Sequence, residues 1–226
     1  MLEYWVWLSE ALYPGGQAEN EWINYFDSAE EVFGAAKDEI SEIEGIMRSE
    51  LDALCHKNLK RAEEIVKYCG ENGIEIITYK SEKYPQVLKN IYAPPAVIYK
   101  RGSLSDFNGI PMFTIVGTRK STKEGERTAY EFACRLSDAG CTVVSGMADG
   151  IDAAANRGAI AGKTPTVAVL GCGVDVVYPA GNAQLMDDII KNGAVISEFS
   201  PGTKARGHHF PIRNRIMAAL GMGVLV

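Results

Sequence analysis

Short apolar runs alternate with amphipathic segments along the chain from Pro111 to its end. The runs have the length and composition of buried strands and lie at Met112–Gly117, Cys141–Gly146, Thr166–Gly171, Ala194–Phe199 and Gly223–Val226. The segments between them have apolar residues at three- and four-residue spacing, which predicts helices over Lys123–Ala139, Gly150–Ala161, Asn182–Lys191 and Pro211–Leu220. Buried strands that alternate with helices build right-handed βαβ units, so the pattern predicts an α/β fold with a doubly wound parallel sheet.

The N-terminal third of the chain carries a different pattern. Its apolar residues recur at helical spacing in short segments with polar breaks between them, and Asn72-Gly73 ends the last segment. We therefore expect a small all-helical domain over residues 1–72 and a sheet domain over residues 73–226. Two strand candidates, Ile74–Tyr79 and Ala96–Gly102, follow the join. We expect them to add to the sheet, because no Gly/Ser-rich or charged linker appears.

Composition narrows the class of protein. Of the 226 residues, 46 % are apolar and 23 % are charged, which is ordinary for a globular protein. No apolar run approaches the roughly 18 residues needed to cross a bilayer. The five cysteines are an odd number and no two have CxxC spacing, so disulfides and a zinc site are both disfavoured. We expect a cytoplasmic protein without a metal site.

The charge of the chain is divided unevenly. Up to Glu75 there are 17 acidic and 6 basic residues, whereas from Ile76 onward there are 12 acidic and 17 basic residues. The formal net charge of −6 therefore belongs to the helical region. The sheet region is basic and is free to bind a polyanion.

The basic residues are densest in one stretch near the end of the chain, Ser200–Leu220. It contains Lys204, Arg206, Arg213 and Arg215, and no acid follows Glu198. Cations beside an aromatic residue, here Phe210, suit a phosphate backbone with exposed bases, since the cations meet phosphates and the ring offers a stacking face. The alternatives are a surface loop with solvated charges and a Phe210 that belongs to the core.

The two arginines of the predicted last helix need a separate explanation. Arg213 and Arg215 lie in its first turn, where the helix dipole disfavours positive charge. Local stability does not account for them. We therefore expect either an anionic ligand or a buried acid such as Glu198 beside them.

Glycine-rich loops follow the first two parallel strands and are candidate phosphate sites. They contain Gly117-Thr118-Arg119 and Ser145-Gly146, and ligands of open parallel sheets bind at the carboxyl ends of the strands. Glycine allows backbone N–H groups to approach an anion, and Arg119 adds a bidentate donor. The alternative is that the glycines only form tight turns.

Motifs of several enzyme classes are absent from the chain. There is no GxGxxG, no P-loop and no GxSxG, so neither a redox cofactor nor a serine hydrolase is favoured. His208 and His209 are adjacent, which is poor spacing for a metal. Asp149 and Asp152 form either an acid/base pair or the charged first turn of a helix. We assign no catalytic residue and no cofactor.

Five separated segments together resemble one known family. They are residues 83–102 (KYPQVLKNIYAPPAVIYKRG), 115–119 (IVGTR), 144–160 (VSGMADGIDAAANRGAI), 166–182 (TVAVLGCGVDVVYPAGN) and 193–220 (GAVISEFSPGTKARGHHFPIRNRIMAAL). In this order they resemble the DprA/Smf family, the DNA-processing proteins of bacterial natural transformation. By its position and helicity, the N-terminal region is similar to the small SAM-like domain of that family.

The resemblance implies an extended Rossmann-like fold that binds single-stranded DNA and is not an enzyme. Members of the family protect the strand, load the RecA recombinase onto it and usually form homodimers. The residues that the resemblance assigns to DNA binding are Gly117, Thr118, Arg119, Ser145, Gly146, Lys204, Arg206, Phe210, Arg213 and Arg215.

The chain departs from the family pattern at a few places. Asn156 stands where the family commonly has histidine, and Thr118 stands where serine is frequent. The remaining strands and last helices of the family lie beyond Val226. We therefore expect a C-terminally truncated chain that lacks surfaces used for dimerisation and RecA contact.

One alternative function belongs to a different class. A Rossmann enzyme that binds and cleaves a phosphorylated nucleoside would use the same loops, with Asp149 or Glu198 as its acid/base group. The basic stretch speaks against this alternative because it carries more positive charge than one nucleotide needs.

Overall fold

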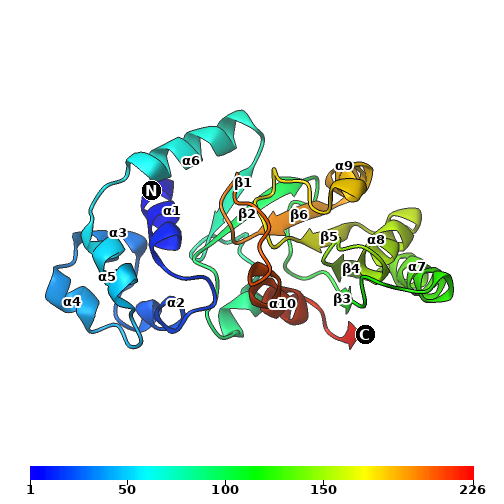
Figure 1. Cartoon of the computed structure of the whole chain (residues 1–226), viewed down its shortest axis with the longest axis horizontal. Helices are drawn as coiled ribbons and strands as arrows, with labels where there is room; N and C mark the ends of the chain where they lie inside the picture. The colour runs from blue at the N-terminus through cyan, green and yellow to red at the C-terminus, as the bar shows by residue number, and fades with distance from the viewer.

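A seven-stranded sheet lies at the centre of the computed structural model, which describes residues 1–226 (Figure 1). Its strands are β1 (Glu75–Thr78), β2 (Val97–Gly102), β3 (Met112–Ile115), β4 (Thr142–Ser145), β5 (Thr166–Val169), β6 (Ala194–Ser197) and β7 (Val224–Leu225). They are ordered β1-β2-β6-β5-β4-β3-β7. The five strands from β6 to β7 are parallel, and β2 and β1 extend the sheet in antiparallel pairs. The predicted α/β fold and the two added strands are confirmed.

Four helices cover the parallel part of the sheet on both faces. They are α7 (Lys123–Asp138), α8 (Ile151–Ala161), α9 (Ala183–Asn192) and α10 (His209–Leu220). Neighbouring residues of one strand face opposite sides. On β4, Val143 belongs to the core cluster of α7 and α8, whereas Val144 belongs to that of α10. The sheet is therefore doubly wound, as the alternation of strands and helices predicted.

The strand order creates one switch point. From β3 the chain builds β4, β5 and β6 successively on one side and then crosses back to place β7 on the other side of β3. Helix α10 makes that return crossing. In sheets of this kind a crevice opens at the carboxyl ends of the strands where the order reverses. That position lies between β3 and β7.

The N-terminal region is entirely helical, as predicted, and lies beside the β1 and β2 edge of the sheet (Figure 1). It consists of α1 (Leu2–Ala11), α2 (Gln17–Glu21), the 3₁₀ turn η1 (Trp22–Asn24), α3 (Ala29–Gly34), α4 (Lys37–Ser41), α5 (Arg48–Cys55) and α6 (Lys60–Glu71). Its core is built on Trp5, Trp7 and Trp22, all buried. The rings of Trp5 and Trp22 meet edge to face with centroids 5.7 Å apart. No helix of the chain has the length and apolarity needed to cross a membrane.

The helical region and the sheet share one hydrophobic core. A single cluster of buried residues runs from Trp5 and Leu54 through Val97 on β2 and Val195 on β6 to Ile189 on α9. The domain boundary between residues 72 and 73 stays a prediction. It marks a change from helices to strands along the chain. It does not mark a break in packing, because apolar contact continues across it.

Candidate functional site

A pocket of about 460 Å³ occupies the switch point of the sheet. Its walls come from the loop after β3, the start of α8, helix α10 and strand β7. Five of the lining residues matter for its chemistry: Gly117, Arg119, Asp152, Phe210 and Arg213. The sequence placed all of these except Asp152 among the site residues. Thr118, also expected there, lines the pocket as well.

Asp152 lies between the two glycine loops. Its carboxylate is buried and accepts a hydrogen bond from the backbone N–H of Gly117 at 3.1 Å. The backbone of Gly146 is close on the other side, because a Cβ there would lie 2.6 Å from Asp152 Oδ2. Burial raises the pKa of this carboxyl, and the backbone donors and Arg213 oppose the rise. The Gly117 amide, which was expected to bind a phosphate, therefore binds an internal carboxylate.

Arg213 forms the floor of the pocket and ties strand ends together. The residue is 3 % exposed, and its Nη1 donates to the carbonyl of Gly146 at 3.0 Å and to that of Val169. A Cβ at Gly146 would lie 2.5 Å from this Nη1, so a larger residue there would displace the guanidinium from its carbonyl partners. Burial lowers the pKa of the guanidinium to about 10, while Asp152 raises it. The residue stays cationic at neutral pH, but its Nη1 donates to backbone carbonyls of the protein itself.

Arg215 does not line the pocket, contrary to expectation. Its guanidinium makes ion pairs with Glu198, just after β6, and with Glu19 of α2 at 3.2 Å. Residues two apart on a helix point in nearly opposite directions, so Arg213 and Arg215 cannot serve the same site. The buried acid that we expected beside these arginines is found here. Arg215 thus joins the helical region to the sheet.

The hydroxyl of Ser145 is also engaged inside the fold. Ser145 is fully buried, and its Oγ donates to the carbonyl of Ile115 on the neighbouring strand at 2.6 Å. The side chain therefore supports the pairing of β4 with β3. It does not reach the rim of the pocket.

Three of the cations expected at the site are exposed: Arg119, Lys204 and Arg206. None of them takes part in an ion pair of the structure. The guanidinium carbon of Arg119 lies 4.5 Å from the centre of the Phe210 ring, a cation–π distance. These side chains are the part of the basic stretch and its neighbouring loop that is free to meet an anion.

The loop that carries Lys204 and Arg206 is anchored from behind. Ser200 Oγ donates to Glu10 of α1 at 2.5 Å, and the Gly202 N–H donates to Asp175 Oδ1 at 2.8 Å. The other oxygen of Asp175 accepts from the hydroxyl of Tyr68 on α6 at 3.0 Å. The two cations therefore extend from a loop whose base is fixed by the helical region.

Of the two adjacent histidines, His208 is exposed and His209 takes part in packing. His209 is buried, its Nδ1 lies 3.0 Å from the carbonyl oxygen of Gly171, and its ring stacks on Phe199 at 4.1 Å. Burial lowers its pKa. No group of three or more His, Cys, Asp or Glu side chains is arranged to hold a metal ion.

Sequence reasoning missed the structural role of Asp152, and for Arg215 it anticipated Glu198 but not Glu19. The sequence placed Asp152 in the first turn of a helix, where the helix dipole already explained its charge. Its backbone partner Gly117 lies on a loop that meets Asp152 only in the folded sheet. Glu19, the second partner of Arg215, lies 196 residues away and carried no signal of its own.

Asn156, where the resemblance had marked a departure, lies in the core. It is fully buried on α8, and its Nδ2 donates to Thr166 Oγ1 at 3.0 Å. The position therefore faces the sheet and not the pocket. The replacement of histidine there leaves the rim unchanged.

Known proteins match the chain along most of its length. It is 33 % identical over 228 residues to the protein Smf of Synechocystis sp., covering 99 % of this chain and 57 % of that protein. It is 33 % identical over 189 residues to the DNA processing protein DprA of Bacillus subtilis, covering 81 % of this chain and 64 % of that protein. The chain thus spans about three fifths of the length of these relatives.

Two solved structures share the fold. The X-ray structure of DNA processing protein A from Streptococcus pneumoniae aligns with a TM-score of 0.79 and 27 % identity over 99 % of this chain and 77 % of that one. A second structure, from Helicobacter pylori, is described by its single-stranded DNA binding mode. It aligns with a TM-score of 0.61 and 26 % identity over 67 % of each chain.

The family model for DNA recombination-mediator protein A matches residues 75–226, the part that builds the sheet and its pocket. The relatives extend the match through the helical region. Together with the predicted motifs, these matches show that the chain belongs to the DprA/Smf family.

Proposed function

We propose that the chain binds single-stranded DNA at the carboxyl rim of its sheet. The observation that carries the proposal is a set of three exposed cations without acidic partners at the carboxyl ends of the strands. Arg119 lines the pocket at the switch point, and Lys204 and Arg206 lie on the loop between β6 and α10. The single-stranded DNA binding mode described for the Helicobacter pylori relative supports it.

Binding at this rim relies on side-chain cations. The amide of Gly117 is occupied by Asp152, so the loops offer less to a phosphate than their glycines suggested. Arg119, held against Phe210, and the two cations of the anchored loop would each neutralise a phosphate and release a counterion. Affinity should therefore fall steeply as salt concentration rises.

The proposal extends to the role implied by the family. In this role the protein is cytoplasmic and covers single-stranded DNA. It thereby protects the strand and presents it to the RecA recombinase during natural transformation. The family model that matches the chain, DNA recombination-mediator protein A, supports this extension. Homodimerisation is part of the same proposal, as is binding without catalysis.

The geometry does not favour the nucleotide-cleaving alternative. Glu198, one of its two candidate acid/base groups, is buried against Arg215 and does not line the pocket. Asp149, the other candidate, is exposed and does not line the pocket either.

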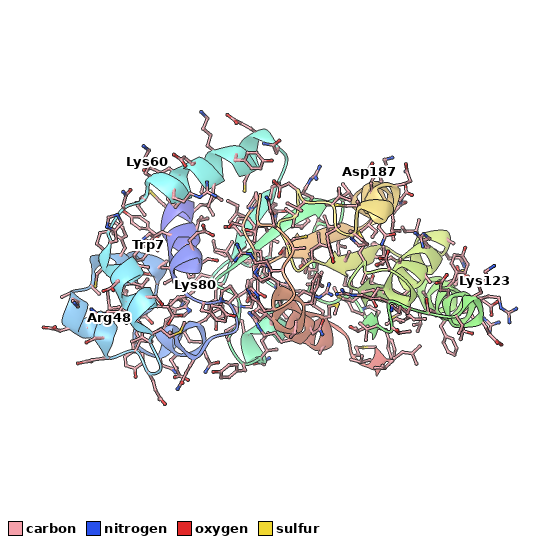
Figure 2. All side chains as sticks on the ribbon, in the orientation of Figure 1. Trp7, Arg48, Lys60, Lys80, Lys123 and Asp187 are labelled. Carbon is pink, nitrogen blue, oxygen red and sulfur yellow. The ribbon has the colours of Figure 1, made fainter.

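Replacement of Arg119 tests the proposed site. We expect Arg119→Ala to weaken the binding of a single-stranded oligonucleotide about tenfold or more and to lower the salt slope of the affinity by about one unit, because one phosphate contact is lost. Fluorescence anisotropy over a series of salt concentrations measures both. The matched control is Arg48→Ala, an exposed arginine at the far end of the helical region (Figure 2).

Duplex DNA and mononucleotides complete the experiment. Preference for the single strand and weak competition by mononucleotides are the expected results. If Arg119→Ala and the unaltered protein bound the single-stranded oligonucleotide equally well, the proposed site would be wrong. Full competition with turnover of a mononucleotide would instead favour the enzyme.

A further inference from the structure

Three rim groups from three separate segments lie in contact. Arg119 follows β3, Phe210 is the second residue of α10, and Tyr178 lies in the loop between β5 and α9. The centre of the Phe210 ring lies 4.5 Å from the Arg119 guanidinium carbon and 5.5 Å from the centre of the Tyr178 ring. The two rings are tilted by 34°. Phe210 is thus the middle member of the group.

The Phe210 ring is surrounded on several sides. Besides Arg119 and Tyr178, the guanidinium carbon of Arg213 lies 5.9 Å from its centre. The backbone of Gly171 is so close that an added Cβ would lie 3.0 Å from Phe210 Cδ1. The Phe210 residue is half-buried, whereas Tyr178 is 39 % exposed.

Exposure alone does not distinguish Tyr178, because Tyr13, Tyr25 and Tyr92 are exposed as well. What distinguishes it is its surroundings. Tyr178 rests on a half-buried ring that also contacts a cation of the proposed DNA site. An aromatic side chain held in place this way loses little conformational entropy when a second ring stacks on it.

We propose that Tyr178 provides the stacking face for an unpaired nucleobase, and that Phe210 is a positioning residue that supports Tyr178 and Arg119. This inference rests on the proposed function and deepens it. Stacking requires a free base face, which a single strand offers and a duplex hides. The proposed contact therefore favours single-stranded over double-stranded DNA, without reading sequence.

The test separates base contacts from phosphate contacts. Two oligonucleotides of equal length are compared, one with bases and one made of abasic sites, which carry the same phosphates. Tyr178→Ala should weaken binding of the base-bearing strand about tenfold, the effect of losing one stacked base, and leave the abasic strand and the salt slope unchanged. Tyr178→Phe should bind as the unaltered protein does, and Tyr92→Ala is the matched control.

Each other outcome overturns the inference. Equal losses on both strands would mean that Tyr178 shapes the rim without contacting a base. If Tyr178→Ala lost no affinity for either strand while Arg119→Ala weakened binding, Tyr178 would have no part in DNA binding. The proposed function would then still hold. If the unaltered protein bound no single strand at all, the proposed function and this inference would fall together.

A fluorescent variant gives an independent measurement. The three native tryptophans, Trp5, Trp7 and Trp22, are buried in the helical region and shielded from the rim. In Tyr178→Trp, stacking on a base should quench the added fluorescence with the base-bearing strand and not with the abasic one. Unchanged fluorescence at saturating base-bearing strand would overturn the proposed contact.

Discussion

Arg213 and Arg215 stand two positions apart on α10 and have different partners. Arg213 donates to the strand-end carbonyls of Gly146 and Val169 under the pocket, whereas Arg215 pairs with Glu198 and Glu19. Removing a cation from water is costly unless it bonds to carbonyl or carboxylate oxygens, and each arginine does so. Both arginines matched the basic pattern of the sequence, but the free cations of the site are Arg119, Lys204 and Arg206.

The cluster of Glu19, Glu198 and Arg215 predicts a dependence of stability on pH. Burial raises the pKa of Glu198 from 4.5 to about 7, against the pull of Arg215, and the pKa of Glu19 is raised by burial and by Glu198. A carboxyl with a higher pKa in the folded than in the unfolded protein favours folding when protonated. Its contribution is therefore lost as pH rises from about 4.5 through about 7.

Glu19→Gln should flatten this dependence. It removes a carboxyl whose own pKa is raised by burial and by Glu198, so the loss of unfolding free energy between pH 5 and 8 should shrink by about 1 to 3 kcal/mol. Urea unfolding at several pH values measures it. The control is Glu30→Gln, near the chain start and outside the cluster. Parallel curves for Glu19→Gln and the unaltered protein would contradict the prediction.

At the scale of elements, helices α1 and α6 act on a loop far from them in sequence. The loop with Lys204 and Arg206 is held by Glu10 through Ser200 and by Tyr68 through Asp175. Strand and helix positions were predictable because each follows from a local period of apolar residues. These anchors were not, because a tyrosine hydroxyl and a carboxylate carry no periodic signal.

Tyr68→Phe should loosen the loop without disturbing the helix. The variant keeps the ring and removes only the hydroxyl that donates to Asp175. We expect faster hydrogen exchange at the Gly202 amide and a roughly two- to twelvefold weaker affinity for the single strand, since one hydrogen bond contributes about 0.5–1.5 kcal/mol. Tyr25→Phe, on the helical region, serves as the control. An unchanged exchange rate would show that the anchor is dispensable.

The whole molecule combines an acidic helical region and a basic sheet region around one core. The cluster from Trp5 to Val195 crosses the predicted domain boundary, and the Glu19–Arg215 ion pair does so as well. Regions that share a core lose their contacts together, so they should unfold together.

We therefore expect a single unfolding transition. Tryptophan fluorescence reports only the helical region, since Trp5, Trp7 and Trp22 all lie there. Thiol labelling of the buried Cys141 and Cys172 reports the sheet. The two midpoints in urea should coincide. Clearly separate midpoints would instead support two independent domains over residues 1–72 and 73–226.

Local periodicity in the chain was enough to predict the order of strands and helices, the parallel sheet and the loops at its carboxyl rim. Such patterns arise from the fixed geometry of helices and strands, so they can be read without knowing what is near in space. Only the tertiary structure decided which charges of that rim are free. Arg215 is neutralised by an acid 196 residues away, Gly117 is bound by Asp152, and Arg119 and Tyr178 meet across Phe210. Whether a charge is available depends on such distant partners, and folding alone brings them together.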